Sequence, residues 1–163
     1  CALPIYVAAF VAWADAVRPE THNLQMFPRM RAWLRGLPPT SVRIITASPE
    51  RLARAWLAAQ GFSDLHVVGM RADATTGAVP QSTFRRGKLA VLARMQGRVV
   101  SMTGNSWTDY EAMMWASTRG AVVTVVNPSS RRPTPYGSFL DLVDAWGWRV
   151  LVLGQVREKR PDA

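Results

Sequence analysis

The feature that most constrains the fold is the alternation of short apolar runs with longer amphipathic stretches. In the first stretch the apolar residues recur at helical spacing up to a Gly-x-Pro-Pro stop. The same pattern predicts helices at 24–37, 49–61, 87–95, 107–118 and 138–146. Short apolar runs between them predict strands at 42–46, 65–70, 98–102, 121–126 and 148–153.

Strands that alternate with helices are typical of a mostly parallel sheet covered by helices on both faces. We therefore expect an α/β fold, a Rossmann-like three-layer sandwich. Two segments interrupt the alternation: 71–84 is polar and indicates a hairpin or excursion, and 127–137 indicates a loop rich in Pro, Ser and Arg. A length of 163 residues suits a single domain.

The charge of the chain is strongly positive, at +9. Apart from Lys88 and Lys159, all of its basic residues are arginines, and such a bias is expected of a GC-rich genome. No basic run is interleaved with aromatic residues as a stacking platform needs, so we expect no nucleic-acid partner. The excess charge would still attract a phosphorylated substrate.

Cysteine and histidine are too few for a disulfide framework or a thiolate metal cluster: Cys1, His22 and His66 stand alone. This fits a cytoplasmic protein. The apolar run at 5–14 stops at Asp15, and a membrane span needs about 20 residues. We expect no stable membrane span in this chain and interpret the run as the end of a helix.

Ligands of parallel sheets bind outside the carboxyl ends of the strands, which points to the residues after Ile45, Met102 and Val126. The first of these segments, Thr46-Ala47-Ser48-Pro49-Glu50, leads directly into a helix. A hydroxyl beside the free amides of a helix N-terminus suits phosphate. The alternative is that Thr46 or Ser48 only caps the helix.

The segment after Met102 is a glycine turn followed by oxygen-bearing side chains. Asn105 and Asp109 could present ligands to Mg²⁺. The alternative is a turn before a helix capped by Ser106 or Thr108. Elsewhere, Lys88 is a lysine in a chain that otherwise uses arginine, which favours a compact point charge that meets a small anion, although chance could also place it there.

Taken in order, these motifs resemble the haloacid dehalogenase-like superfamily of phosphatases. The closest branch is the phosphoserine phosphatase-like one (subfamily IB), which includes bacterial lipid-phosphate phosphatases. Residues 46–50 resemble its second motif, Gly87-Lys88 its third and residues 104–109 its fourth. The resemblance covers roughly 24–153, and residues 125–128 and 147–151 are similar to the C-terminal part of that branch.

The resemblance implies a magnesium-dependent phosphomonoester hydrolase that works through an aspartyl-phosphate intermediate. Thr46 would hydrogen-bond a phosphoryl oxygen, with Ser48 at the same phosphate site. Lys88 would neutralise charge on the nucleophile and on the transferred group. Asn105 and Asp109 would hold Mg²⁺ directly or through water. The substrate would be a phosphorylated small molecule or a lipid phosphate, with phosphoserine and sugar phosphates also open.

The opening motif of that family, Asp-x-Asp-x-Thr after an apolar strand, does not occur in the chain, since Asp15, Asp141 and Asp144 do not fit it. The initial Cys-Ala-Leu-Pro-Ile resembles the translated end of a sequencing adapter. We therefore expect 1–5 to be foreign, 6–23 to be the remnant of a helical cap or a linker, and 155–163 to be a disordered tail. Residues 24–154 would be the core domain, lacking its first strand and most of a helical cap. The intact protein would be a phosphatase and this fragment inactive.

A second departure is Asn105, where the family usually has an aspartate. A neutral amide lowers cation affinity, so an alternative is a non-catalytic pseudophosphatase or binding protein of the same fold. A third reading, a nucleotide-binding α/β domain, lacks both the Gly-x-Gly-x-x-Gly and the Gly-x-x-x-x-Gly-Lys-Ser/Thr sequences. The oligomeric state cannot be inferred from the sequence.

Overall fold

The computed structural model describes residues 26–71, 73, 78, 81–126, 133–134 and 137–153. These residues belong to two compact units. The first unit contains Met26 and Ala32–Gly97, and the second contains Phe27–Arg31 and the chain from Arg98 onward. The predictions for 1–5, 6–23 and 155–163 lie outside the described residues, as does the Asn127-Pro128 pair.

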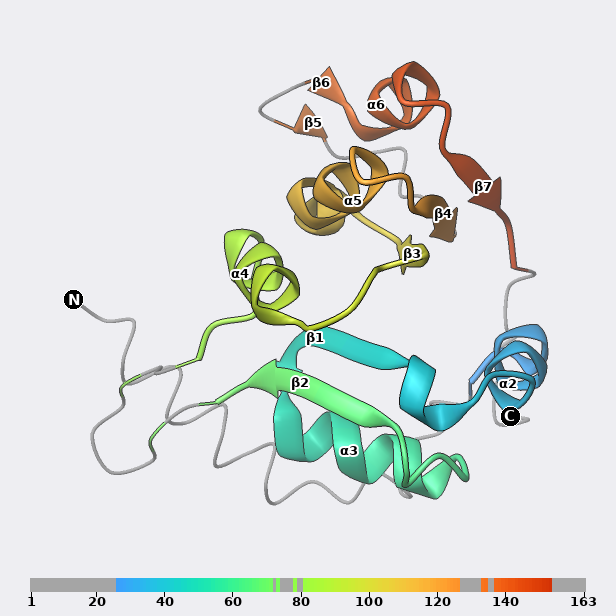
Figure 1. Cartoon of the computed structure of the whole chain (residues 1–163), viewed down its shortest axis with the longest axis vertical. Helices are drawn as coiled ribbons and strands as arrows, with labels where there is room; N and C mark the ends of the chain where they lie inside the picture. Colours follow the sequence, from blue (N-terminus) through green and yellow to red (C-terminus); the bar gives the residue numbers. More distant parts are fainter. Residues whose placement is uncertain are drawn as a thin grey trace, which may run out of the picture. The chain divides into compact units, whose positions relative to one another are not determined.

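The first unit is a β-α-β crossover followed by a further helix (Figure 1). Strands β1 (Arg43–Pro49) and β2 (His66–Met70) pair in parallel, and helix α3 (Glu50–Ala59) connects them. Helix α4 (Arg86–Arg94) follows and packs on β1. A short 3-10 helix, η2 (Pro39–Ser41), precedes β1. Leu57 of α3 and Val67 of β2 are buried in this unit.

Helix α2 (Pro28–Arg35) is the described part of the helix expected at 24–37, and its residues are divided between the two units. It begins at a proline, which is favoured at the first helical position because that position needs no amide donor. Leu34 is its buried residue. The helix type is confirmed, and its described length is shorter than its apolar periodicity indicated.

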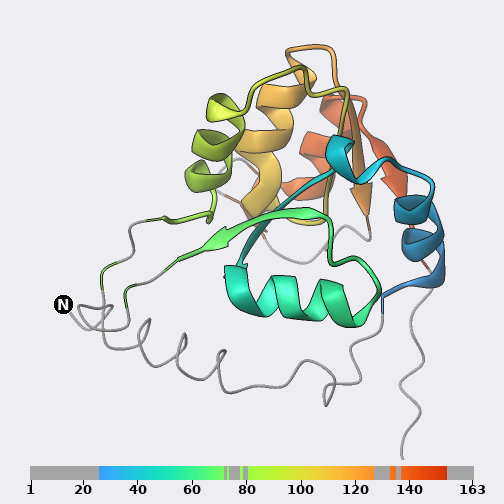
Figure 2. The same ribbon diagram turned by 60° about the horizontal axis from the view of Figure 1, so that its bottom comes forward.

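The second unit contains a three-stranded parallel sheet of order β3-β4-β7, made of β3 (Ser101–Gly104), β4 (Val122–Val126) and β7 (Arg149–Leu151). The 3-10 helix η3 (Trp107–Asp109) and helix α5 (Tyr110–Ser117) connect β3 to β4. Along the chain, β4 is followed by an antiparallel pair, β5 (Pro133–Thr134) and β6 (Gly137–Ser138), and then by helix α6 (Phe139–Ala145), drawn in orange-red in Figure 2, before β7 begins. The buried core of this unit consists of Met113, Val123, Val125, Phe139, Val143 and Trp148.

Helices α3 and α6 end in the same way, each with a glycine in the left-handed region. Gly61 has φ +86° and Gly147 has φ +62°. The Gly61 amide donates to the Ala58 carbonyl at 2.9 Å, and the next amide, of Phe62, donates to the Leu57 carbonyl at 2.9 Å. This is a Schellman motif, and α6 repeats it through Gly147 and Trp148. In both helices the residue after the glycine is buried and leads toward the next strand.

The expected α/β fold with parallel strands is confirmed in both units. Strand β3 begins at Ser101 and not at 98, because the ladder of β4 pairs only with Ser101–Gly104. Within the segment 71–84, where a hairpin or excursion is predicted, the structure has an antiparallel bridge between Arg71 and Gln81. The β5-β6 pair lies in the predicted loop 127–137 except for Ser138, which is predicted to begin a helix. Among the described helices, none has the length and apolar character that a membrane crossing needs.

Candidate functional site

The carboxyl end of β1 leaves the regular ladder at the first predicted phosphate segment. The parallel register runs to Ile45, opposite Val68, and resumes at Pro49, opposite Met70. Three residues of β1, 46–48, therefore lie opposite the single residue Gly69 of β2. Such a bulge turns backbone and side-chain groups out of the sheet. The predicted residues Thr46 and Ser48 both lie in this bulge.

Thr46 and Ser48 contact each other and do not cap α3. The Ser48 amide donates to the Thr46 hydroxyl oxygen at 3.1 Å, which closes a local turn. The N-cap position of α3 is Pro49, and no side chain makes a cap hydrogen bond there. The capping alternative is therefore wrong for this helix. A hydroxyl that accepts one hydrogen bond keeps its own proton as a donor, so Thr46 retains a donor for a ligand oxygen.

Thr83 joins the end of β1 to the segment that carries Lys88. Its side chain is completely buried, at 0% exposure, and its hydroxyl donates to the Thr46 carbonyl. A buried hydroxyl needs such a partner, because an unpaired one costs about 1–3 kcal/mol. The bond connects positions 37 residues apart and fixes the backbone of the bulge from the side of α4.

The backbone of the turn before α4 is closely held, and Lys88 lies in the first turn of that helix. The Lys88 amide donates to the Arg85 carbonyl at 2.9 Å, and Arg85 has the unusual φ of +50° for a residue with a side chain. A Cβ on Gly87 would collide with the Ser82 carbonyl. Close packing thus requires a glycine at 87, and the backbone amide of Lys88 is held by Arg85.

The buried Glu50, the first residue of α3, is the centre of an ionic cluster in this unit. Its carboxylate accepts from Arg54 at 3.1 Å, from Arg71 at 3.1 and 2.9 Å, and from the Gly69 amide at 3.2 Å. Burial by itself would raise the pKa of Glu50, but the hydrogen bonds from Arg71, Gly69 and Arg54 outweigh it. The pKa falls from 4.5 to about 2. Glu50 is therefore ionised at neutral pH, and it raises the pKa of Arg71 in turn.

Gly69 allows this cluster to form. A Cβ at this position would lie 2.5 Å from Cα and 2.7 Å from the backbone nitrogen of Glu50. Only glycine lets the start of α3 approach β2 so closely. The carbonyl of Gly69 also accepts from the Gln81 side chain at 2.6 Å. The amide of Gly69 therefore holds the start of α3, and its carbonyl holds the segment that contains Gln81.

The predicted metal residues Asn105 and Asp109 lie in the second unit, after β3. Oδ2 of the buried Asp109 accepts from the backbone N–H of Asn105 at 3.1 Å and from the backbone N–H of Ser106 at 3.2 Å. Ser106 and Asp109 form a capping box at η3, so the alternative of a capped helix after the turn is confirmed. The side chain of Asn105 is exposed.

Asn105 and Asp109 supply only part of a magnesium site. One carboxylate oxygen of Asp109 is engaged by two amides, and Asn105 offers a neutral oxygen. Mg²⁺ needs near-octahedral oxygen coordination with at least one or two carboxylates. In the part of the chain that the structure describes, no group of three or more His, Cys, Asp or Glu residues could hold a metal ion. These residues alone therefore do not fit a complete Mg²⁺ site.

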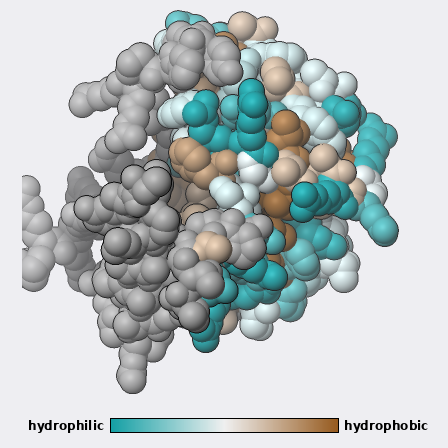
Figure 3. Space-filling view, turned by 90° about the vertical axis from the view of Figure 1, so that its left-hand side faces the viewer, coloured by the Kyte–Doolittle hydropathy of each residue, from teal (hydrophilic) through white to brown (hydrophobic). Residues whose placement is uncertain are grey.

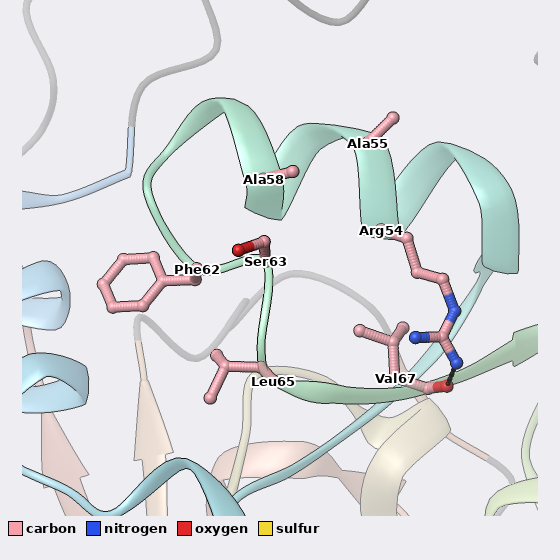
Figure 4. A pocket seen from close by; sticks show the side chains of 7 residues that line it. All are labelled: Arg54, Ala55, Ala58, Phe62, Ser63, Leu65 and Val67. Carbon is pink, nitrogen blue, oxygen red and sulfur yellow. Dashed lines mark hydrogen bonds between the residues drawn. The ribbon is translucent and has the colours of Figure 1, made fainter.

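A pocket of about 300 Å³ lies between α3 and β2 and contains none of the predicted residues (Figure 4). Its walls are mostly apolar, and Arg54 crosses its rim to donate to the Val67 carbonyl at 2.7 Å. The residues that line it are Arg54, Ala55, Ala58, Phe62, Ser63, Leu65 and Val67. It lacks convergent polar groups that are free to orient a ligand, so it does not compete with the end of β1 as a candidate site.

Sequence reasoning missed Thr83 and the pairing of Glu50 with Arg71. Neither belongs to a motif, and each makes its contact across more than twenty residues of chain. The only local signal was the glutamate at the first helical position after Thr46-Ala47-Ser48-Pro49. No protein family, curated protein or solved structure matches the chain, so its function is argued from these residues.

Proposed function

We propose that the chain is the core of a phosphomonoester hydrolase with a Rossmann-like three-layer sandwich fold, and that the end of β1 is its phosphate site. One observation carries the proposal. The buried hydroxyl of Thr83 donates to the Thr46 carbonyl and so ties the backbone of the bulge to the turn that leads into α4, where Lys88 lies in the first turn.

The chemistry of these groups suits a phosphoryl dianion. Thr46 donates to one phosphoryl oxygen, and the exposed Ser48 lies beside it in the same bulge. Lys88 supplies a compact positive charge at the start of a helix, where backbone amides also favour anions. The charge of +9 on the whole chain assists encounter with a phosphorylated small molecule or lipid phosphate.

The family resemblance implies an aspartyl-phosphate intermediate and Mg²⁺ as cofactor, but Asn105 and Asp109 alone do not fit a complete Mg²⁺ site. The chain has no Asp-x-Asp-x-Thr sequence. We therefore expect it to bind phosphate weakly and to hydrolyse nothing.

A second candidate is a non-catalytic phosphate-binding protein of the same fold. It is favoured by the engagement of Asp109 with two backbone amides and by the neutral side chain at Asn105. A variant Asn105→Asp should not create turnover of 4-nitrophenyl phosphate in this chain. Release of phosphate by the unmodified chain would contradict both the expected inactivity and this second candidate.

The decisive experiment is a titration with inorganic phosphate followed by isothermal calorimetry or ³¹P NMR. The two lysines of the chain give a matched pair of variants, Lys88→Ala and Lys159→Ala, which remove the same charge. We expect Lys88→Ala to weaken binding by about tenfold or more, and Lys159→Ala to leave it unchanged. Equal losses in both variants would show that only the overall charge attracts phosphate, and the proposed site would be wrong.

A further inference from the structure

Arg71 is a second cation at the same end of the first sheet. Both strands of that sheet run toward this end, and Arg71 follows directly after Met70, the last residue of β2 (Figure 1). Met70 is the register partner of Pro49, which closes the bulge of residues 46–48. Arg71 is therefore one residue beyond the point where the proposed phosphate segment rejoins the ladder.

The guanidinium of Arg71 is held along one edge only. Nε donates to Oε2 of Glu50 at 3.1 Å and Nη2 donates to Oε1 at 2.9 Å. This two-point contact fixes the plane of the guanidinium. Among the described residues Nη1 has no hydrogen-bond partner, and the side chain is 61% exposed. The outer edge of the guanidinium, which carries Nη1, therefore remains able to donate to an oxyanion.

The cluster around Glu50 keeps a positive charge for such an anion. One carboxylate is shared by two arginines, Arg54 and Arg71, which leaves an excess of one positive charge. Arg54 is also used by the fold, because it donates to the Val67 carbonyl. On the side toward which β2 points, hydrophilic and hydrophobic residues lie side by side in the described part of the surface (Figure 3). Because the side chain of Arg71 is itself largely exposed, an anionic group can reach its guanidinium from solvent.

We propose that Arg71 binds a second anionic group of the substrate, so that the site selects phosphomonoesters that also carry a carboxylate or another phosphate. Glu50 is the positioning residue that orients the Arg71 guanidinium, and Arg71 is the residue that contacts the ligand. The inference rests on the proposed phosphate site at Thr46 and Lys88, and it narrows the substrate class to molecules with two anionic ends.

The test compares three ligands that share a C2 hydroxyl and one phosphate group and differ at the opposite end, with the full chain and isothermal calorimetry. At that end glycerol 1-phosphate has a neutral hydroxyl, 3-phosphoglycerate has a carboxylate, and glycerol 1,3-bisphosphate has a second phosphate. We expect both ligands with two anionic ends to bind about tenfold more tightly than glycerol 1-phosphate. The ligand that binds more tightly of these two identifies which anionic group, carboxylate or phosphate, the Arg71 guanidinium binds better.

Two arginine variants separate ligand binding from structure. Arg71→Leu should abolish the preference while leaving the affinity for inorganic phosphate unchanged. Arg54→Leu removes the same charge and also one ion pair of Glu50, and it should keep the preference. Arg71→Lys, which keeps the charge but not the fork, guards against misfolding of the leucine variant and should reduce the preference several-fold.

Two kinds of negative result can be told apart. Arg71 has no such role if inorganic phosphate binds at a site that depends on Lys88 but the wild-type chain does not prefer ligands with two anionic ends. The same conclusion follows if Arg54→Leu loses that preference as fully as Arg71→Leu does. If no ligand binds, inorganic phosphate included, the phosphate site itself is wrong and the inference about Arg71 is wrong with it.

Discussion

The two units of the chain have the same kind of connectivity, and both bury apolar residues, but they differ in how a crossover helix contacts its sheet. Each is built from parallel strands joined by helical crossovers. In the first unit, the start of α3 is fixed to β2 by the ionic cluster of Glu50. In the second, helices α5 and α6 pack on the sheet through an apolar core. The contact of a crossover helix with its sheet thus includes an ionic cluster in the first unit and is apolar in the core of the second.

Aromatic side chains reinforce the packing of the second unit. The rings of Trp146 and Trp148 stack with centroids 5.9 Å apart, and Tyr110 lies 5.8 Å from Trp148. The polar atoms of both indoles are satisfied: Trp146 donates to the Tyr110 hydroxyl and Trp148 to the Ser117 hydroxyl, each at 3.1 Å. Such contacts do not depend on pH in the acid range, whereas those of Glu50 do. This difference can be tested directly.

The largest effect is expected from the apolar core. Phe139 is 2% exposed, and Phe139→Ala should lower the free energy of unfolding by about 3–5 kcal/mol through lost burial and a residual cavity. Urea denaturation followed by tryptophan fluorescence measures the loss, which should be the same at neutral and acid pH. Leu151→Ala on β7, where the leucine is 39% exposed, is the control and should cost less than about 1 kcal/mol. Equal losses would mean that the core does not hold this unit.

The ionic cluster should contribute almost as much, but only above acid pH. The pKa of Glu50 is about 2 in the folded chain and 4.5 ordinarily, which corresponds to about 3 kcal/mol. Because the folded pKa is the lower one, this stability is present above pH 4.5 and is lost as the pH falls toward 2. Glu50→Gln should therefore be less stable than wild type at neutral pH and should converge with it near pH 2.

Urea denaturation of both proteins across this pH range measures the convergence. Curves that stay parallel from neutral pH to pH 2 would contradict the assignment of the stability to the Glu50 carboxylate.

A smaller loss is expected where α3 approaches β2. In Gly69→Ala, the new methyl group would lie 2.5 Å from the Glu50 backbone, so helix and strand must separate. We expect a destabilisation of about 1–3 kcal/mol, typical of overpacking. Gly36→Ala is the matched control, because the nearest atom to its Cβ would be 3.5 Å away. Thermal unfolding of the two variants compares them, and a loss no larger than that of the control would refute the close approach.

The smallest effect should be alike in both units. At Gly61 and Gly147 a Cβ would meet nothing within 4 Å, so only the positive φ opposes an alanine. Each substitution should cost about 1–2 kcal/mol, the price of a left-handed residue with a side chain. Chemical denaturation of the two single variants gives both values. A marked difference between them would show that the helix ends are not equivalent.

The sequence predicted what depends on local periodicity. The alternation of apolar runs and helical stretches located the five principal strands. For the turn before Asp109, a capped helix was one of the two alternatives that the sequence offered, and the structure shows a capping box there. The limits of β3 could not be predicted, because they depend on which residues of β4 are opposite. Thr83 and Thr46 are 37 residues apart, and Glu50 and Arg71 are 21 apart. Such pairs are decided by three-dimensional proximity and have no periodic signal.

The Schellman motifs at the ends of α3 and α6 have a consequence for the order of folding. Their hydrogen bonds join residues at most five positions apart, from Leu57 to Phe62 and from Val143 to Trp148. Closing so short a loop loses little chain entropy. The reversal after each helix can therefore form before any strand finds its partner. This lowers the contact order of each crossover and favours rapid folding in spite of its parallel strands.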